Sequence, residues 1–252
     1  MQDLIVSIVD NSGIEEYQEA KQAIIGSIPR PRLGLSIQAG FIPLFSKKIY
    51  KLKYILDRAY GDEGKIYPER KDVFKIFNSV DLSEIKVVIT AQDPYHNGAA
   101  TGRAFEVKKG FRINESLVNM KKELRDEGFK KVRKDGNLSH WVNQGVFLLN
   151  RSLTVKKGQA GSHMDLWMKF TASVIKYILE NTENVAWMLL GGPAGRLDEI
   201  IEKYDHRGHE YFKASHPSPL GAHSGSNPFF GSNIFRYVND YLKKNNRGKI
   251  RW

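Results

Sequence analysis

The sequence predicts an α/β fold: a single domain with a central, mostly parallel four-stranded sheet flanked by helices. Two observations predict it. Short apolar runs with the length of buried strands recur along the chain, and segments with a helical repeat of apolar residues lie between them. The chain length of 252 residues suits one α/β domain, and a hydrophobic fraction of 41% is enough for a sizeable core.

Each expected strand is a short apolar run bounded by polar or turn residues. The four runs are Lys86–Thr90, Val146–Asn150, Val185–Leu190 and Glu210–Ala214. In sheets of this kind, ligands bind beyond the carboxyl ends of the strands. Polar or glycine-rich positions end or follow these runs: Asp93, Asn150, the loop Gly191–Gly195 and His216. We therefore expect these positions to converge at one edge of the sheet.

The expected helices are segments whose apolar residues recur every three or four positions. Their ranges are 14–27, Ile49–Ala59, Asp72–Asn78, Ser116–Glu127, Asp165–Asn181, Arg196–Tyr204 and Asn233–Asn245. Asn114 or Ser116 would cap the fourth of them. Residues 29–45 contain three prolines and two glycines and are expected to be irregular. We expect residues 1–45 to form a peripheral N-terminal segment of one domain that spans residues 1–252.

Charge and cysteine content limit the classes of function. Lys and Arg number 39 against 28 Asp and Glu, which gives a net charge of +11. Such an excess favours a polyanionic partner such as nucleic acid, although a solvated basic surface has the same composition. The absence of cysteine excludes disulfides, thiolate chemistry and cysteine-ligated metal centres. The first residues make a poor signal peptide, and no apolar run approaches the ~18 residues of a membrane span. We expect an intracellular protein without a membrane partner, cytoplasmic or, in a eukaryotic setting, nuclear.

Three segments contain the candidate chemistry. They are Gln92-Asp93-Pro94-Tyr95-His96 after the first strand, Gly145–Asn150 at the second, and His216-Pro217-Ser218-Pro219-Leu220 after the fourth. In this order they resemble the signature segments of the family-1 uracil-DNA glycosylases, and so do Phe229-Phe230-Gly231 and Gly248–Trp252. The likeness extends from about Tyr67 to the end. One short motif is a weak signal, whereas several in order, each beside its predicted strand, are specific.

The resemblance implies a repair enzyme that flips uracil out of DNA and hydrolyses its N-glycosidic bond. Asp93 would stabilise the cationic sugar and orient the attacking water. His216 would act as a neutral hydrogen-bond donor to O2 of the departing uracil anion, in the manner of an oxyanion hole. The products would be free uracil and an abasic site. No lysine stands out as a Schiff-base nucleophile, so strand cleavage is not expected, and no metal or cofactor is implied.

The resemblance also implies which residues read the base and hold the DNA. Tyr95 would exclude the 5-methyl group of thymine, Asn150 would pair with O4 and N3–H of uracil, and Phe105 would stack on the base. Gln92 would add backbone contacts. Leu220 would fill the gap that the flipped base leaves in the stack. The remaining expected DNA contacts are His96, Ser116, Gly192 and Ser218. Outside this context Asp93-Pro94 would be a turn, Phe105 a core aromatic and Leu220 an ordinary surface leucine.

Several segments depart from the family pattern. The loop after His96 is one residue shorter and has Thr101 and Arg103 where His and Leu are usual. Residues 111–115 replace a proline-rich loop, Gly192 replaces a serine, and residues 222–228 lengthen the loop after Leu220 by about three residues. We expect retained chemistry with an altered grip on DNA, and leave open whether single- or double-stranded DNA is preferred.

Three other functions are compatible with parts of the sequence. A nucleotide-binding enzyme could use the glycine turn at 191–195, but neither Gly-x-Gly-x-x-Gly nor Gly-Lys-Ser/Thr is present. A zinc hydrolase could be built on His206 and His209, but a clear third ligand is lacking. The most serious rival is a non-catalytic DNA-binding or processivity subunit, against which Asp93, Asn150 and His216 argue. The expected partners are uracil-containing DNA and a protein inhibitor or replication partner, and the expected state is a monomer.

Overall fold

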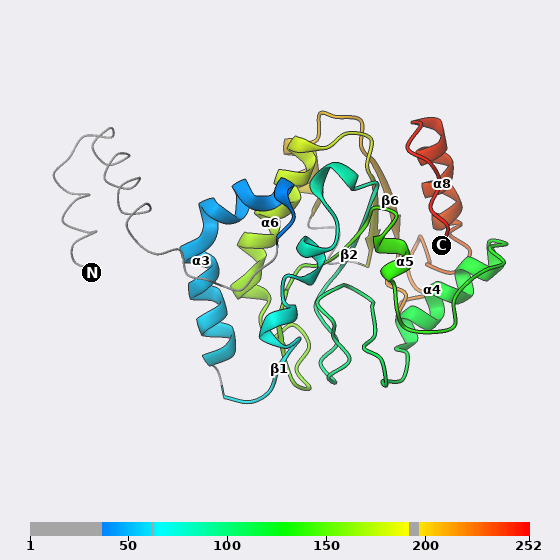
Figure 1. Ribbon diagram of the computed structural model, residues 1–252. Coiled ribbons are helices and arrows are strands. Elements are labelled where there is room, and N and C mark those ends of the chain that lie inside the picture. The colour runs from blue at the N-terminus through cyan, green and yellow to red at the C-terminus, as the bar shows by residue number, and fades with distance from the viewer. Residues whose placement is uncertain (1–36, 62, 192–196) are drawn as a thin grey trace. The chain divides into compact units, whose positions relative to one another are not determined.

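The computed structural model describes residues 37–61, 63–191 and 197–252, which belong to one compact unit (Figure 1). The predicted helix at 14–27, most of the expected N-terminal segment, and Gly192 with the following turn lie outside the described residues. None of the described helices is long and apolar enough to cross a membrane.

The predicted four-stranded sheet is confirmed, and every strand pair in it is parallel. Its strands are β2 (Val87–Ala91), β3 (Val146–Asn150), β5 (Ala186–Leu190) and β6 (Glu210–Ala214), arranged in the order β3-β2-β5-β6. β2, β3 and β5 are buried along their whole length, as their continuous apolar runs predict for a sheet covered on both faces. The carboxyl ends lie level, since Ala91 pairs with Asn150 and Leu190 with Ala214.

Helices cover both faces of this sheet, as Figure 1 shows. On one side lie α3 (Ile42–Gly61) and α6 (Met164–Asn181), with α7 (Asp198–Tyr204) packed beside α6. On the other lie α4 (Glu115–Asp126), α5 (Ser139–Val142) and α8 (Ile234–Lys244). The start of α4 is set by Asn114, whose side chain accepts a hydrogen bond from the Ser116 N–H at 3.1 Å.

Two expectations about the N-terminal half were wrong. The helix predicted at Ile49–Ala59 already begins at Ile42, because Pro43 lies in its first turn, where the missing N–H would have no helical partner anyway. Residues 42–45 are therefore helical, not irregular. The helix predicted at Asp72–Asn78 is instead a pair of 3-10 turns, Arg70–Asp72 and Lys75–Asn78, and further 3-10 turns form at Ala39–Phe41 and Leu82–Glu84.

The core contains two aromatic clusters. The first lies beneath α3 and α6, where Phe45 packs edge-on against Phe74, Phe77 and Phe170. The second joins Trp141, Phe235 and Trp252, with Trp252 edge-on to Trp141 at 5.2 Å. These clusters fix the helices on the sheet and so fix the loops at its carboxyl edge.

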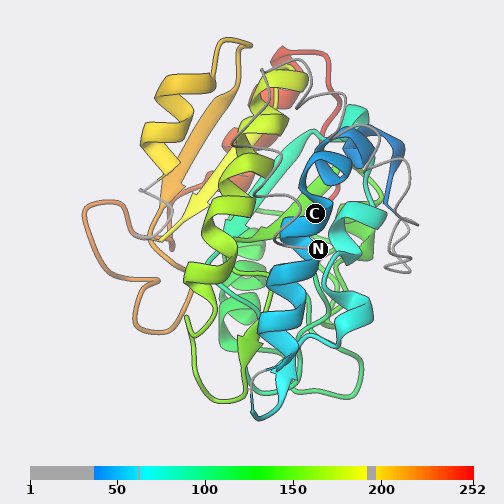
Figure 2. The same ribbon diagram turned by 90° about the vertical axis from the view of Figure 1, so that its left-hand side faces the viewer.

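A small antiparallel pair, β1 (Ile66–Tyr67) with β4 (Val155–Lys156), was not predicted, because two-residue strands are too short for a pattern. It positions the segment that precedes α6. The Gly158 N–H donates to the carbonyl of His96 at 3.0 Å, so this segment lies beside the loop that follows β2. Figure 2 shows β1 and β4 at the lower end of α3 and α6.

Candidate active site at the carboxyl edge of the sheet

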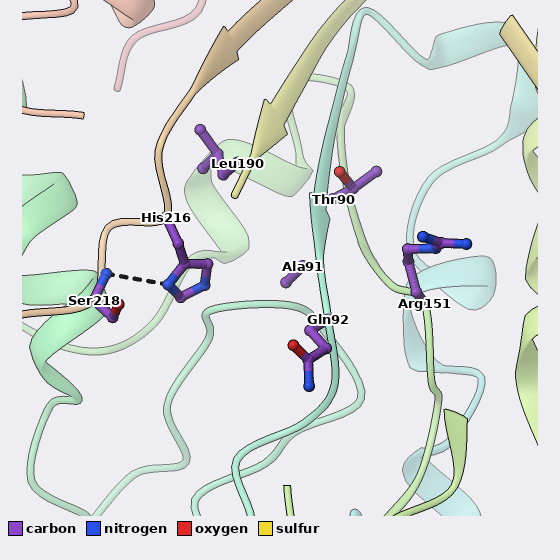
Figure 3. Close-up of a pocket in the computed structure, with 7 residues that line it drawn as sticks. All are labelled: Thr90, Ala91, Gln92, Arg151, Leu190, His216 and Ser218. Atoms are coloured by element: carbon purple, nitrogen blue, oxygen red, sulfur yellow. Dashed lines mark hydrogen bonds between the residues drawn. The ribbon is translucent and has the colours of Figure 1, made fainter. Parts of the chain in front are cut away.

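A pocket of about 260 Å³ lies at the carboxyl edge, as predicted from the strand pattern (Figure 3). All four strands or the residues after them contribute to its lining, which comprises Thr90, Ala91, Gln92, Arg151, Leu190, His216 and Ser218. The segments that resemble the glycosylase signatures are thus brought together, although they are far apart in the chain.

Asp93 follows β2 and is partly buried. Its Oδ2 accepts a hydrogen bond from the N–H of Gly161 at 2.5 Å. Burial raises the pKa of the Asp93 carboxyl, while the Gly161 N–H and the nearby His96 act in the opposite direction. A carboxylate of raised basicity, fixed by a backbone amide, is suited to orient water and to face a cationic sugar.

His216 follows β6 at the pocket wall. Its Nδ1 accepts a hydrogen bond from the N–H of Ser218 at 3.1 Å, so the proton of the neutral ring is on Nε2. Burial lowers the pKa of the imidazole, which favours this neutral form. Gly191 packs closely on the ring: a Cβ built there would lie 3.0 Å from Cβ of His216. The ring is therefore held as a neutral Nε2–H donor.

Phe105 is buried, and its ring lies 6.1 Å from that of His216, tilted by 32°. Its backbone has φ +62°, a conformation that costs energy for a bulky residue and persists only where the surroundings impose it. The hydroxyl of Tyr95 donates to the Phe105 carbonyl at 3.2 Å. Burial raises the pKa of Tyr95, which keeps the phenol protonated as a donor. Phe105 thus contacts both Tyr95, through this hydrogen bond, and His216, through its ring.

Asn150 ends β3 beside Ala91 and is 5% exposed. Its Oδ1 is buried with no hydrogen-bond partner among the described residues. A buried amide oxygen without a partner is costly, and at an active-site edge it indicates a ligand that donates to it. The carbonyl of Gln92 accepts a hydrogen bond from the Ser152 N–H at 2.9 Å, which ties the loops after β2 and β3 together. The expected backbone contact of Gln92 with the base stays a prediction.

The expected DNA contacts differ in their surroundings. His96 and Leu220 are exposed, Leu220 to 91%, while Ser116 is buried at the start of α4. The Ser218 hydroxyl accepts from the Gly221 N–H at 3.2 Å, so it is used within its own loop. The lengthened loop is closed by Ser215, whose hydroxyl donates to the Gly221 carbonyl and accepts from the Phe229 N–H, both at 2.8 Å.

Sequence reasoning did not select two residues that build the site. Gly161 holds Asp93 with φ +76°, a backbone conformation that glycine adopts readily. Arg151 lines the pocket although it is 5% exposed. The only available signal for either was its neighbourhood: Arg151 directly follows Asn150, and Gly161 lies in the glycine-containing turn after β4.

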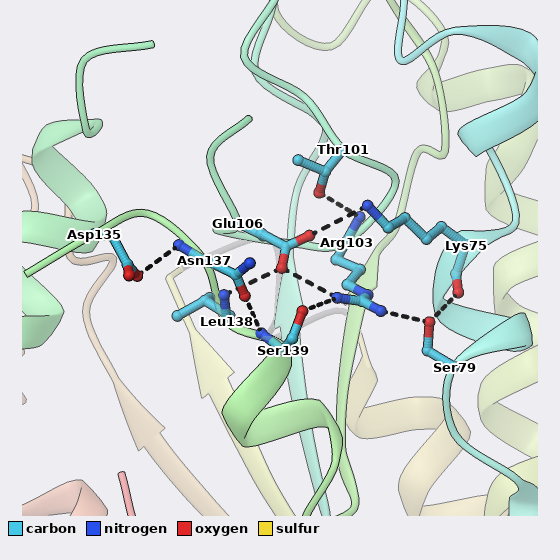
Figure 4. A network of polar contacts seen from close by, with 9 residues as sticks. All are labelled: Lys75, Ser79, Thr101, Arg103, Glu106, Asp135, Asn137, Leu138 and Ser139. Carbon is cyan, nitrogen blue, oxygen red and sulfur yellow. Dashed lines mark hydrogen bonds and ion pairs between the residues drawn. The ribbon is translucent and has the colours of Figure 1, made fainter. Parts of the chain in front are cut away.

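Two residues that flank Phe105 in the chain, Arg103 and Glu106, belong to a polar network, in which Arg103 departs from the family pattern (Figure 4). The Arg103 side chain is 10% exposed and pairs with Glu106 at 3.1 Å. It also donates to the hydroxyls of Ser139 and Ser79, at 2.9 and 2.7 Å. Glu106 in addition accepts from the Leu138 N–H at 3.1 Å. Arg103 and Glu106 lie on either side of Phe105 in the chain, so their buried ion pair fixes the turn that contains Phe105.

The proposed zinc ligands are not placed as ligands. His209 is buried, accepts from the Val185 N–H at Nδ1 and lies 3.2 Å from the Leu179 carbonyl at Nε2, which is a structural role. Among the described residues, no group of three or more His, Asp or Glu side chains is placed to hold a metal ion.

Comparison with known proteins agrees with this geometry. The family model of the uracil DNA glycosylase superfamily matches residues 77–243. The uracil-DNA glycosylase of Aliarcobacter butzleri is 41% identical over 205 residues, 80% of this chain and 92% of that protein. The Escherichia coli enzyme is 46% identical over 191 residues, 74% of this chain and 80% of its own.

Solved structures are similar as well. The crystal structure of mimivirus uracil-DNA glycosylase superposes with a TM-score of 0.78 at 25% identity, covering 96% of this chain and 93% of its own. A variant of the mimivirus enzyme in complex with UGI superposes with a TM-score of 0.77 at 26% identity, covering 85% and 88%.

Proposed function

The chain belongs to the uracil DNA glycosylase superfamily and excises uracil from DNA, and on this premise we propose that the pocket at the carboxyl edge receives the flipped base. The observation that carries the proposal is the hydrogen bond from the Ser218 N–H to Nδ1 of His216, because it leaves Nε2–H as the donor of a neutral ring. That donor is what a departing uracil anion requires.

The reaction assigned to this site begins with lengthening of the glycosidic bond. The sugar gains positive charge, which the Asp93 carboxylate stabilises, and the uracil gains negative charge at O2, which His216 stabilises through Nε2–H. Water oriented by Asp93 then attacks the sugar carbon. Its proton passes to the carboxylate, and the products are an abasic site and free uracil. No side chain is bonded covalently to the DNA, so the strand is not cleaved.

Base selection is assigned to three residues. The unpartnered Oδ1 of Asn150 suits the N3–H of uracil, and the same amide can donate to O4; cytosine presents the wrong polar edge. The Tyr95 ring would exclude a 5-methyl group, and Phe105 would stack on the base. A site that pairs a specific polar edge discriminates strongly, because the wrong base leaves buried groups unpaired.

Contacts to DNA complete the proposal. Leu220 projects fully from its loop and would occupy the space vacated by the flipped nucleotide. His96 in the loop after β2, Ser116 at the start of α4 and Ser218 in the loop after β6 would contact phosphates, with the net charge of +11 adding salt-dependent affinity. We propose that the protein acts as a monomer on single- or double-stranded DNA. The structure of a mimivirus relative in complex with UGI supports the proposal that a protein inhibitor binds this chain.

The test is incubation of the purified protein with an end-labelled strand containing one uracil, in the presence of EDTA, followed by alkali and gel electrophoresis. Cleavage at uracil alone, and only after alkali, is expected for a metal-independent enzyme that does not cut the strand. If folded protein binds the DNA but releases no uracil, the non-catalytic DNA-binding function replaces this one.

A further inference from the structure

An exposed aromatic side chain stands among cations in the segment between Phe105 and α4. Residues 108–112 are all exposed, and Lys108, Lys109 and Arg112 surround Phe111, whose side chain is 43% exposed. The exposed part of the ring offers a flat apolar surface beside positive charge, which suits a partner that has both an apolar face and negative charge.

This segment is attached to the catalytic loop. A Cβ built on Gly98 would lie 3.3 Å from Cε1 and 3.4 Å from Cζ of Phe111, so the phenyl ring rests on the glycine two positions after His96. The Lys108 N–H donates to the Ala99 carbonyl at 2.9 Å. The ring is therefore fixed relative to Asp93 and Tyr95, which begin the same loop.

Phe111 also lines a second pocket, of about 650 Å³, next to the polar network of Arg103 and Glu106. Its lining includes Lys75, Lys108, Lys109 and Ile113. Lys75 and Lys108 face acidic partners, at 3.7 Å from Glu106 and 2.9 Å from Glu69. Lys109 has no ion-pair partner among the described residues and is exposed. The pocket thus combines apolar surface with a cation that is available to an anionic ligand.

Aromatic faces beside cations are the combination by which proteins hold single-stranded nucleic acid, because every base has a stackable face and every nucleotide a phosphate. We propose that Phe111 is a stacking platform for an unpaired base of the substrate strand outside the uracil pocket, with Lys109 facing its phosphates. Arg112 adds positive charge beside the ring, although its guanidinium is paired with Glu115 at 2.9 Å. The inference rests on the proposed function, since uracil in the catalytic pocket anchors the strand. In a duplex the neighbouring bases cover both faces of each base, so the platform favours single-stranded DNA.

The first experiment measures kcat/KM on one uracil-containing strand, single-stranded and annealed to its complement, for wild type and four variants. Phe111→Ala should lower the single-strand value by roughly tenfold and leave the duplex value nearly unchanged. Phe111→Trp should retain the wild-type values. Phe111→Leu, which keeps an apolar contact with Gly98 but no ring, should behave like the alanine variant. Tyr237→Ala, an exposed aromatic on α8, is the matched control and should change neither value.

The second experiment identifies the base. Each nucleotide flanking the uracil in the single strand is replaced in turn by an abasic analogue. An abasic analogue at one of these positions should lower the activity of wild type, and the same analogue should not change the activity of Phe111→Ala. Equal sensitivity of both proteins at every position would overturn the platform, and so would equal losses on single strand and duplex, which would indicate damage to the catalytic loop.

A third measurement separates failure of this inference from failure of the proposed function. A uracil-free single strand is titrated into Phe111→Trp and into wild type, and tryptophan fluorescence is followed. Stacking predicts additional quenching in the variant alone, whether or not the protein excises uracil. Uracil release by wild type without that quenching refutes the platform and leaves the glycosylase assignment intact.

Discussion

The Ser218 N–H donates to Nδ1 of His216 over 3.1 Å, so the backbone of the loop that carries Leu220 also sets the tautomer of the imidazole. One short segment thereby joins the imidazole that would face the base to the side chain that would enter the DNA stack. A shift of this loop would move both together, which couples insertion into the duplex to alignment of the donor.

The first prediction concerns this tautomer. Nitrogen NMR of the free protein should show the His216 ring protonated at Nε2 only at neutral pH, and double protonation should begin only below the ordinary range of a histidine, because burial lowers the pKa of this imidazole. His216→Leu should reduce kcat by about 10²–10³-fold, as expected for loss of one oxyanion donor. A ring that is doubly protonated at neutral pH, or a folded leucine variant with full turnover, would remove His216 from this role.

Asp93 should govern the acid limb of activity. Burial raises its pKa, so kcat/KM should fall as pH decreases through a value above 3.8, where the carboxylate takes up its proton. Asp93→Asn should lower turnover by about 10²–10⁴-fold and remove this limb from the residual activity. The pH profiles of the two proteins, measured in parallel, provide the check.

The same substitution should affect stability in the opposite direction. Folding raises the pKa of this carboxyl, so the folded protein favours its protonated form. As pH rises from the pKa of the unfolded state through that of the folded state, the carboxyl ionises and the free energy of unfolding decreases. Asp93→Asn removes that cost. Its Tm relative to wild type should therefore increase between about pH 4 and neutrality; a Tm difference that shrinks over this range would contradict the burial argument.

Asn150→Asp should weaken the selection of uracil. The buried amide would be replaced by a carboxylate that accepts hydrogen bonds but cannot donate to O4, and discrimination of about 10–100-fold should be lost, corresponding to ~1–3 kcal/mol for a paired edge. Release of uracil and cytosine from otherwise identical strands measures it. Asn143→Asp, outside the pocket, is the matched control and should preserve the ratio.

Leu220→Ala should impair duplex substrates more than single-stranded ones, because only a duplex has a gap to fill. With the side chain 91% exposed, the substitution should leave Tm unchanged. Val118→Ala, another exposed apolar residue, should alter neither substrate. Equal losses on the two substrates would argue that Leu220 does not act as a wedge.

Arg103→Leu should destabilise the fold by about 3–5 kcal/mol, because it leaves the Glu106 carboxylate buried without its nearest cation. The double variant Arg103→Leu with Glu106→Gln should recover much of this loss, since the amide oxygen can still accept from Leu138. Denaturant unfolding of wild type, both single variants and the double variant gives the coupling energy. Additive effects would show that the two side chains do not act as a pair.

The sheet and its active edge could be predicted because buried parallel strands have continuous apolar sequences, which end where polar residues begin. This reasoning predicted the carboxyl edge of the sheet, where Asn150 ends β3, Asp93 follows β2 and His216 follows β6. It could not predict the bond from Gly161 to Asp93, because the two residues are brought together by β1 and β4, each only two residues long. Nor could it predict the buried pair of Arg103 and Glu106, since charged residues are ordinarily assigned to the surface.

The order in which the strands leave the ribosome has its own consequence. A nascent chain that has emerged through β5 contains Asp93 and Asn150, but His216 and Leu220 follow β6 and emerge last. Because β6 pairs only with β5 in this sheet, the imidazole is positioned only when the final strand has been added. With His216 in its proposed role, an incompletely synthesised protein would attract DNA through its positive charge before it could remove a base, and excision would begin only with the finished sheet.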